Sequence, residues 1–252
     1  MPDEARVSLP KGDLFPKGWW GRPRLGDRKQ GETSRESMYA TVGHALSNWV
    51  EVEDKFAQLL LYMCIDQNTL FVSQYIDRIF GSIENMGGRI KAFEAAAAIY
   101  FFPYWEISVV KKTMKLLLSE IEKASHRRND IAHGRVVSVK SDAIEFDENG
   151  LKYPETDEYD ASGFMLVAPE HMTWRNTHYY EGLIHDDPLA RFRSEYRLNA
   201  KDILLFGYKF SLLKNEINRF HFLIQRTSST DEPRLIKLLK TEYPQAFRRP
   251  VR

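Results

Sequence analysis

The sequence has a single cysteine, no long apolar run and no internal repeat. One thiol cannot form an internal disulfide, so we expect a reducing compartment. The apolar neighbours of that residue, Cys64, predict a buried side chain. No run of about 18 apolar residues could cross a membrane, and the first residues lack the apolar segment of a secretory signal peptide. We therefore expect a cytoplasmic protein with no membrane partner.

The bulk composition is that of a globular protein. The chain has 252 residues, of which 43% are hydrophobic and 13% aromatic, which is enough to build a proper core. The net charge is only +1, but both ends are basic: residues 1–35 hold eight Lys/Arg and five Asp/Glu, and residues 232–252 hold six and two. Basic ends can bind phosphate backbones. They can equally serve only to keep a protein soluble, and both interpretations stay open.

Apolar residues recur at helical spacing through most of the chain. The pattern predicts long helices over residues 34–63, 70–83, 86–101, 104–134 and 199–226, and a short one near 233–241. Ser34 and Asn199 are suitable N-caps, and Gly134 is a natural C-terminal cap. The expected core faces of the first and fourth helices consist of Val42, Leu46, Trp49, Phe56, Leu60, Met63, Ile107, Val110, Met114, Leu117, Leu118 and Ile121.

Between the fourth and fifth long helices the pattern changes to one typical of strands. Residues 135–185 contain VVSVKSDAIEF, a DENG turn and GFMLVA, which predict a small β-hairpin or meander. The expected fold is thus mainly all-α, an antiparallel bundle of four or five helices with a β insert. We expect three segments: an irregular basic arm over 1–34, which the Trp19–Trp20 pair could pin to the body, the bundle over 35–231, and a basic tail over 232–252.

The segment RRNDIAHG, residues 127–134, lies on the last turn of the fourth predicted helix. Asn129 and His133 are four residues apart and share a face, with Arg128 about 100° to one side. A histidine near a helix C-terminus tends to keep its proton and can act as an acid, and a guanidinium can bind phosphate through two donors. Asn129 could orient the imidazole. This combination suits phosphodiester cleavage without a metal.

The same segment also fits an ordinary helix end. Basic residues and histidine are common in last turns, and glycine often follows them. An arginine five residues before a histidine also arises by chance in many proteins of ordinary composition.

Arg128, Asn129 and His133 in this order resemble the Arg-x4–6-His signature of the HEPN superfamily (higher eukaryotes and prokaryotes nucleotide-binding). In that family the residue after the arginine is often Asn, Asp or His, and the motif ends a late bundle helix. The stretch HALSNWVEVE, residues 44–53, resembles the acidic first helix of many bacterial members. The likeness covers roughly residues 36–135 and 197–226, and it leaves out the arm and the β insert.

The resemblance implies a metal-independent endoribonuclease without a cofactor. In the family, two motifs meet across a homodimer to form one composite site, and cleavage by the 2′-hydroxyl leaves a 2′,3′-cyclic phosphate. Members act as toxins, in abortive infection and in phage defence, so an antitoxin or regulatory protein is a further expected partner. By position, Arg128 and His133 would be catalytic and Asn129 would support them. The alternative is a non-catalytic HEPN-like dimeric scaffold that binds RNA, nucleotide or a protein.

Further charged residues are candidates for minor roles. For a supporting carboxylate the candidates are Glu53, then Glu51, and Asp130; for RNA contacts they are Arg127, Arg89, Lys91 and Arg135. Ordinary ion pairs and solvated surface charge explain such residues equally well. A metal site built from His171, His178 and His185 is the remaining rival, but a spacing of seven aligns side chains only on a helix, and their segment does not have a helical pattern. We therefore expect no metal.

Overall fold

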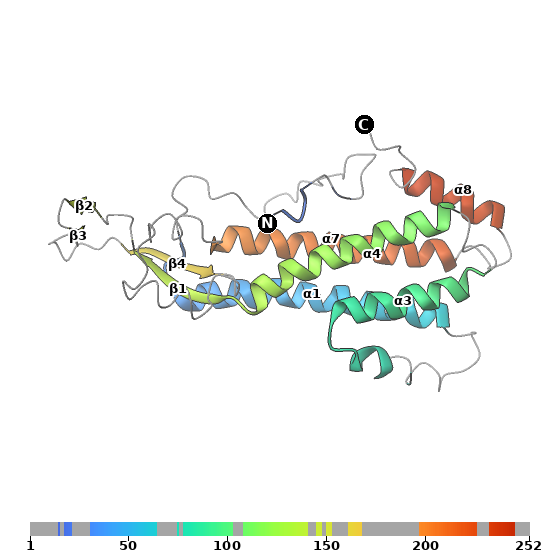
Figure 1. The fold of residues 1–252 in the computed structure, drawn as a ribbon, viewed down its shortest axis with the longest axis horizontal. Helices are drawn as coiled ribbons and strands as arrows, with labels where there is room; N and C mark the ends of the chain where they lie inside the picture. Colours follow the sequence, from blue (N-terminus) through green and yellow to red (C-terminus); the bar gives the residue numbers. More distant parts are fainter. Residues whose placement is uncertain are drawn as a thin grey trace, which may run out of the picture. The chain divides into compact units, whose positions relative to one another are not determined.

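The computed structural model of the chain describes residues 15, 18–21, 31–64, 75, 78–102, 108–140, 145–147, 150–152, 161–167, 197–225 and 232–244. This part is mainly helical (Figure 1), which confirms the predicted fold class. Its named helices are α1 (Arg35–Cys64), α3 (Met86–Tyr100), α4 (Ser108–Ala132), α7 (Ala200–Gln225) and α8 (Glu232–Glu242). The helix expected over residues 70–83 is helical at Tyr75 and at 78–82, ends before Ile83, and has its other residues outside the described part. None of the described helices is both long and apolar enough to cross a bilayer.

The helix starts follow the predicted capping residues. The Ser34 Oγ accepts a hydrogen bond from the amide of Ser37 at 3.0 Å. At the start of α7, the Asn199 side chain accepts from the Asp202 amide at 2.9 Å, and the Asp202 carboxylate accepts from the Asn199 amide at 3.2 Å. This reciprocal pair satisfies two amides that the helix itself leaves without partners. The predicted cap at Gly134 is wrong: its φ is not positive, because the chain passes directly from the helix end into a strand.

The chain divides into two compact units, and the division falls inside the long helices. Unit 1 comprises Met1–Gly21, Glu51–Ser125 and Leu212–Arg252. Unit 2 comprises Arg22–Val50 and His126–Ser211. The helices α1, α4 and α7 therefore each have one part in unit 1 and one part in unit 2.

Within unit 1, aromatic contacts join α1 to α3. Phe56 stacks on Phe93 with ring centroids 4.6 Å apart, and Tyr62 lies 5.9 Å from Tyr100. Because the partner numbers rise together, these two helices run parallel. Figure 1 shows α4 running in the opposite direction in this unit. The helices pack here because their apolar faces are buried, and the expected core residues Phe56, Met114 and Ile121 are each 0% exposed.

Within unit 2, α1 and α7 approach each other closely at Gly207. A Cβ at that position would lie 3.2 Å from the Ala45 Cα and 3.2 Å from the Asn48 amide nitrogen, so only glycine fits without adjustment. The Asn48 side chain donates to the Gly207 carbonyl at 3.2 Å. One turn further on, Trp49 packs edge-on against Phe210 at 5.3 Å, which confirms the predicted core role of Trp49.

The predicted β insert is also in unit 2. β1 (Arg135–Lys140) pairs with β4 (Ala161–Val167), and β4 pairs with β5 (Arg197–Leu198), all antiparallel. β2 (Glu145–Asp147) and β3 (Gly150–Lys152) form a second, two-stranded sheet. The end of the arm also joins the first sheet, because Glu32 and Phe164 exchange backbone hydrogen bonds of 2.9 and 2.7 Å.

The structure confirms the prediction about the tryptophan pair and contradicts the one about Cys64. The pair attaches the arm to α4: Trp20 is 7% exposed, and its indole nitrogen donates to the Glu120 carboxylate at 2.7 Å. Phe15 packs against both indoles. Cys64 was expected to be buried, but it is exposed. It is the last residue of α1, one position beyond Met63, where the buried face of the helix ends.

Candidate functional site

The candidate site lies at the C-terminal end of α4, in unit 2. The buried Ile131, 1% exposed, fixes the rotation of the last turn. Asn129 and His133 consequently face solvent, and both are exposed. The His133 amide donates to the Asn129 carbonyl at 3.1 Å, so the backbone is still helical up to the histidine. The pattern of four-residue spacing thus places the amide and the imidazole on one exposed face, as the sequence predicted.

Arg128 is half-buried beside this face. One terminal nitrogen of its guanidinium donates to the Asn129 side-chain oxygen at 3.0 Å. Its Nε is buried, and within the described residues it has no hydrogen-bond partner. A buried donor without a partner costs free energy, of the order of 1–3 kcal/mol. Because this Nε is out of reach of solvent, an anion would be held by the terminal nitrogens of the guanidinium, which commonly bind phosphate through two hydrogen bonds. The side chain of Asn129 therefore orients the arginine, while its backbone carbonyl holds the histidine.

The neighbouring charges of the motif serve the fold. Arg127 and Asp130 form an ion pair of 2.7 Å between side chains that are 14% and 11% exposed. Asp130 has little surface for contact with a substrate, and Arg127 shares its charge with this partner. Of the two adjacent arginines, Arg128 is therefore the better candidate for binding an anion. Arg135, the first residue of β1, is exposed.

The other candidate carboxylates and cations belong to unit 1. The Glu53 carboxylate accepts from the Arg89 guanidinium at 2.8 Å, and Arg89 also donates to the Ile83 carbonyl at 2.9 Å. These contacts give both side chains a structural explanation. Glu51 pairs with Lys214 at 2.7 Å, and the hydrogen bond from that lysine lowers the pKa of Glu51.

The remaining predicted positions either form no such ion pair among the described residues or lie outside them. Lys91 is exposed on α3. The histidines of the rival metal site, at 171, 178 and 185, lie outside the described residues. Among the residues that are described, no cluster of three or more His, Cys, Asp or Glu could hold a metal ion.

Sequence reasoning assigned no site to the cations of α8, although it noted the basic tail. Arg234, Lys237 and Lys240 are all exposed. Their spacing of three residues on a short amphipathic helix is the signal that could have shown them on one face.

Comparisons of the chain with protein-family models, with curated proteins and with solved structures find no match.

Proposed function

We propose that this protein is a metal-independent endoribonuclease whose site includes Arg128, Asn129 and His133. The observation that carries the proposal is the difference between neighbours on one helix turn. A terminal nitrogen of Arg127 is paired with the Asp130 carboxylate, whereas a terminal nitrogen of Arg128 donates to the uncharged side chain of Asn129, on the turn that leads to the exposed His133. That arrangement supplies an anion-binding donor and a proton-transfer group together.

The proposed reaction uses the 2′-hydroxyl of the RNA as the nucleophile. An imidazole of His133 removes the proton from this hydroxyl, and the oxygen forms a bond to phosphorus. Arg128 stabilises the negative charge that builds on the phosphoryl oxygens. The bond from phosphorus to the 5′-oxygen then breaks, and a protonated imidazole donates a proton to the leaving oxygen. The products are a 2′,3′-cyclic phosphate and a 5′-hydroxyl.

Two imidazoles in opposite protonation states serve this reaction best, one as base and one as acid. A homodimer that brings two copies of the motif together would provide both, and this part of the proposal rests on the HEPN resemblance. A role as a toxin or defence effector, with an antitoxin or another regulatory protein as partner, rests on the same resemblance.

The test is cleavage of mixed cellular RNA by purified protein in excess EDTA. Three variants accompany the wild type: Arg128→Ala, His133→Ala and the matched control His126→Ala. His126 is an exposed histidine seven residues earlier on the same helix. We expect cleavage to survive chelation, to persist in the control and to fall by roughly 100-fold or more in the other two variants. Product ends should carry cyclic phosphate.

Two results would count against the proposal. Equal cleavage by wild type and His133→Ala would show that the activity does not use this helix end. If neither cleaves any RNA but both bind it equally, the non-catalytic RNA-binding scaffold is the better description.

A further inference from the structure

The C-terminal helix α8 has two chemically different faces. Leu235 and Leu239 are 5% and 0% exposed, and the next residue at this spacing, Tyr243, is 0% exposed. Arg234, Lys237 and Lys240 are exposed instead. Steps of three residues rotate by about 60° on a helix, so these three cations fall within roughly 120° of one another.

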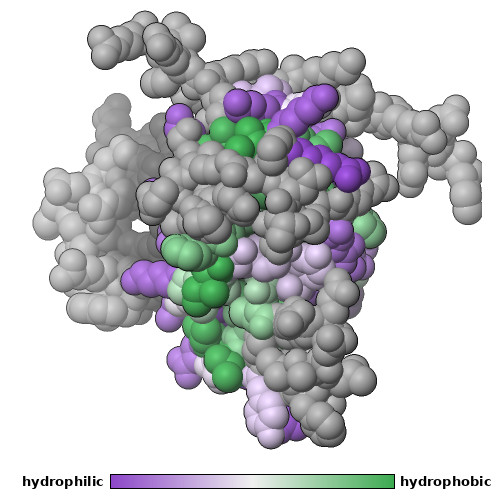
Figure 2. Space-filling view, turned by 90° about the vertical axis from the view of Figure 1, so that its right-hand side faces the viewer, coloured by the Kyte–Doolittle hydropathy of each residue, from purple (hydrophilic) through white to green (hydrophobic). Residues whose placement is uncertain are grey.

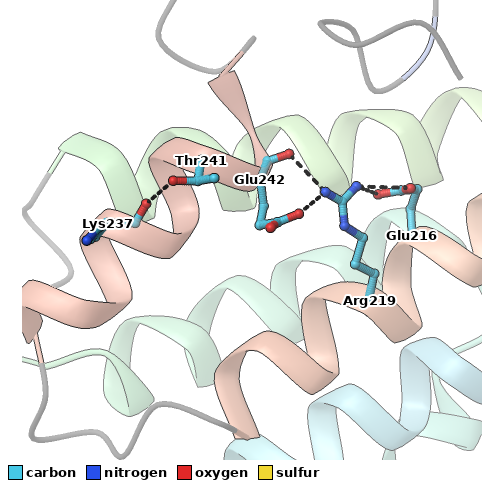
Figure 3. A network of polar contacts seen from close by, with 5 residues as sticks. All are labelled: Glu216, Arg219, Lys237, Thr241 and Glu242. Carbon is cyan, nitrogen blue, oxygen red and sulfur yellow. Dashed lines mark hydrogen bonds and ion pairs between the residues drawn. The ribbon is translucent and has the colours of Figure 1, made fainter.

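The helix is held in place by a polar network with α7, drawn in Figure 3. Arg219 donates to both the carboxylate and the backbone carbonyl of Glu242, and its other terminal nitrogen reaches Glu216 at 3.4 Å. The Arg219 guanidinium also lies over the Tyr243 ring, 5.5 Å from its centroid. These contacts use the acidic group at the end of α8, so Glu242 is already neutralised and does not offset the exposed cations.

In Figure 2 hydrophilic side chains lie next to hydrophobic ones near the top of the drawn face, the side on which α8 lies in Figure 1. The lysines at 237 and 240 form none of the ion pairs found within the described residues. In Figure 3 the only bond drawn at Lys237 is to its backbone carbonyl, which accepts from the Thr241 hydroxyl at 2.9 Å.

We propose that the exposed face of α8 binds the phosphodiester backbone of RNA, with Lys237 and Lys240 as the main contacts. The face spans roughly 9 Å along the helix, at about 1.5 Å per residue, which matches the length of a few phosphates. Neither ammonium group has an acidic partner within the described residues, and two such cations suit a chain of separate negative charges. The identification of the bound polyanion as RNA rests on the proposed function. The existence of the cationic face on α8 does not depend on it.

The test measures binding and keeps it separate from cleavage. A labelled single-stranded RNA oligonucleotide is titrated with the full chain, carrying His133→Ala so that the RNA stays intact. Lys237→Gln/Lys240→Gln is compared with the control Arg78→Gln/Lys201→Gln, which removes two other exposed cations. At about 0.1 M salt, we expect the first pair to weaken binding roughly tenfold. The slope of log affinity against log salt should fall by about 1.4, at roughly 0.7 per phosphate contact.

Further variants and ligands identify what the face recognises. Lys237→Arg/Lys240→Arg keeps the charge and should bind like the parent. Equal losses in the glutamine pair and its control would reduce the effect to net charge and overturn the proposal. Unchanged RNA binding, with loss of binding to phosphatidylserine vesicles, would make the face a membrane contact and also overturn it. Because binding is measured without cleavage, an inactive enzyme that still binds through α8 would refute only the proposed function.

Discussion

Replacing Arg219 by glutamine tests how α8 is attached to the bundle. The wild-type guanidinium serves two carboxylates at once, the buried Glu216 and the more exposed Glu242. The glutamine removes the charge and leaves the carboxyl group of Glu216, which is 7% exposed, inside the protein without its cation. The substitution therefore acts mainly by isolating a buried carboxylate.

The size of the effect follows from burial. Removing one partner of a fully buried ion pair costs about 3–5 kcal/mol. The Arg219 side chain is 44% exposed, so solvent screens much of its interaction, and we expect a loss of about 2 kcal/mol in the free energy of unfolding. Glu216→Gln should cost almost nothing, because burial already raises the pKa of Glu216 despite the opposing effect of Arg219. The double variant Arg219→Gln/Glu216→Gln should recover about half of the stability that Arg219→Gln loses.

The dependence on pH separates this mechanism from loss of packing. Because the folded-state pKa of Glu216 is raised above its unfolded value, the folded protein binds that proton more tightly. This group's contribution to stability is therefore present below the unfolded pKa and disappears as the pH rises through the folded one. In Arg219→Gln the guanidinium no longer opposes the effect of burial, so the pKa of Glu216 should be raised further than in the wild type. The free energy of unfolding should therefore increase more steeply on acidification from neutral pH. Glu216→Gln should abolish this component.

Urea denaturation of the four proteins between pH 5 and 7.5, followed by circular dichroism, measures these differences. Equal destabilisation by the two single variants, with parallel pH profiles, would refute the reasoning, since it would show that the network acts through shape and not through a buried charge.

Three further predictions concern stability and can be measured in the same assay. Trp20→Phe should cost about 1.5–3 kcal/mol because it removes a hydrogen bond to the buried Glu120 carboxylate. Asn199→Ala should cost about 1 kcal/mol as a lost N-cap, and Asn199→Asp should be nearly neutral. Gly163→Ala should cost about 2 kcal/mol or more, because its φ of 101° is strained for alanine and the new Cβ would lie 2.5 Å from the Glu32 carbonyl oxygen. A neutral effect at Gly163 would mean that the arm does not pair with β4 in solution.

The helices were predictable from the sequence because their capping residues and the spacing of their apolar residues indicate the same segments. The caps at Ser34 and Asn199 follow from short-range chemistry, and both form the expected bonds. The packing at Gly207 was not predictable, since it depends on Ala45 and Asn48, about 160 residues away in the sequence. The same reason explains the misassigned Gly134, whose backbone is set by the strand that follows it.

The site shows the same division between local and distant information. Helical spacing was sufficient to place Asn129 and His133 together on an exposed face. Spacing could not show that Glu53 binds Arg89, because these residues lie 36 positions apart and meet only through the packing of α1 on α3. Charged residues that were equivalent candidates in the sequence can thus be distinguished by the partners that they have in the fold.

The pair Arg127 and Arg128 makes the strongest case for a functional reading of this helix end. A helix end that needed only cations for its dipole would be served equally by either arginine. Yet a terminal nitrogen of Arg127 is paired with the buried Asp130, while one of Arg128 donates to the exposed, uncharged amide of Asn129. The charge of Arg128 is thus offset by none of the ion pairs found within the described residues. A phosphate that binds Arg128 would supply the missing negative charge through charge-assisted hydrogen bonds, which are stronger than the bond to a neutral amide.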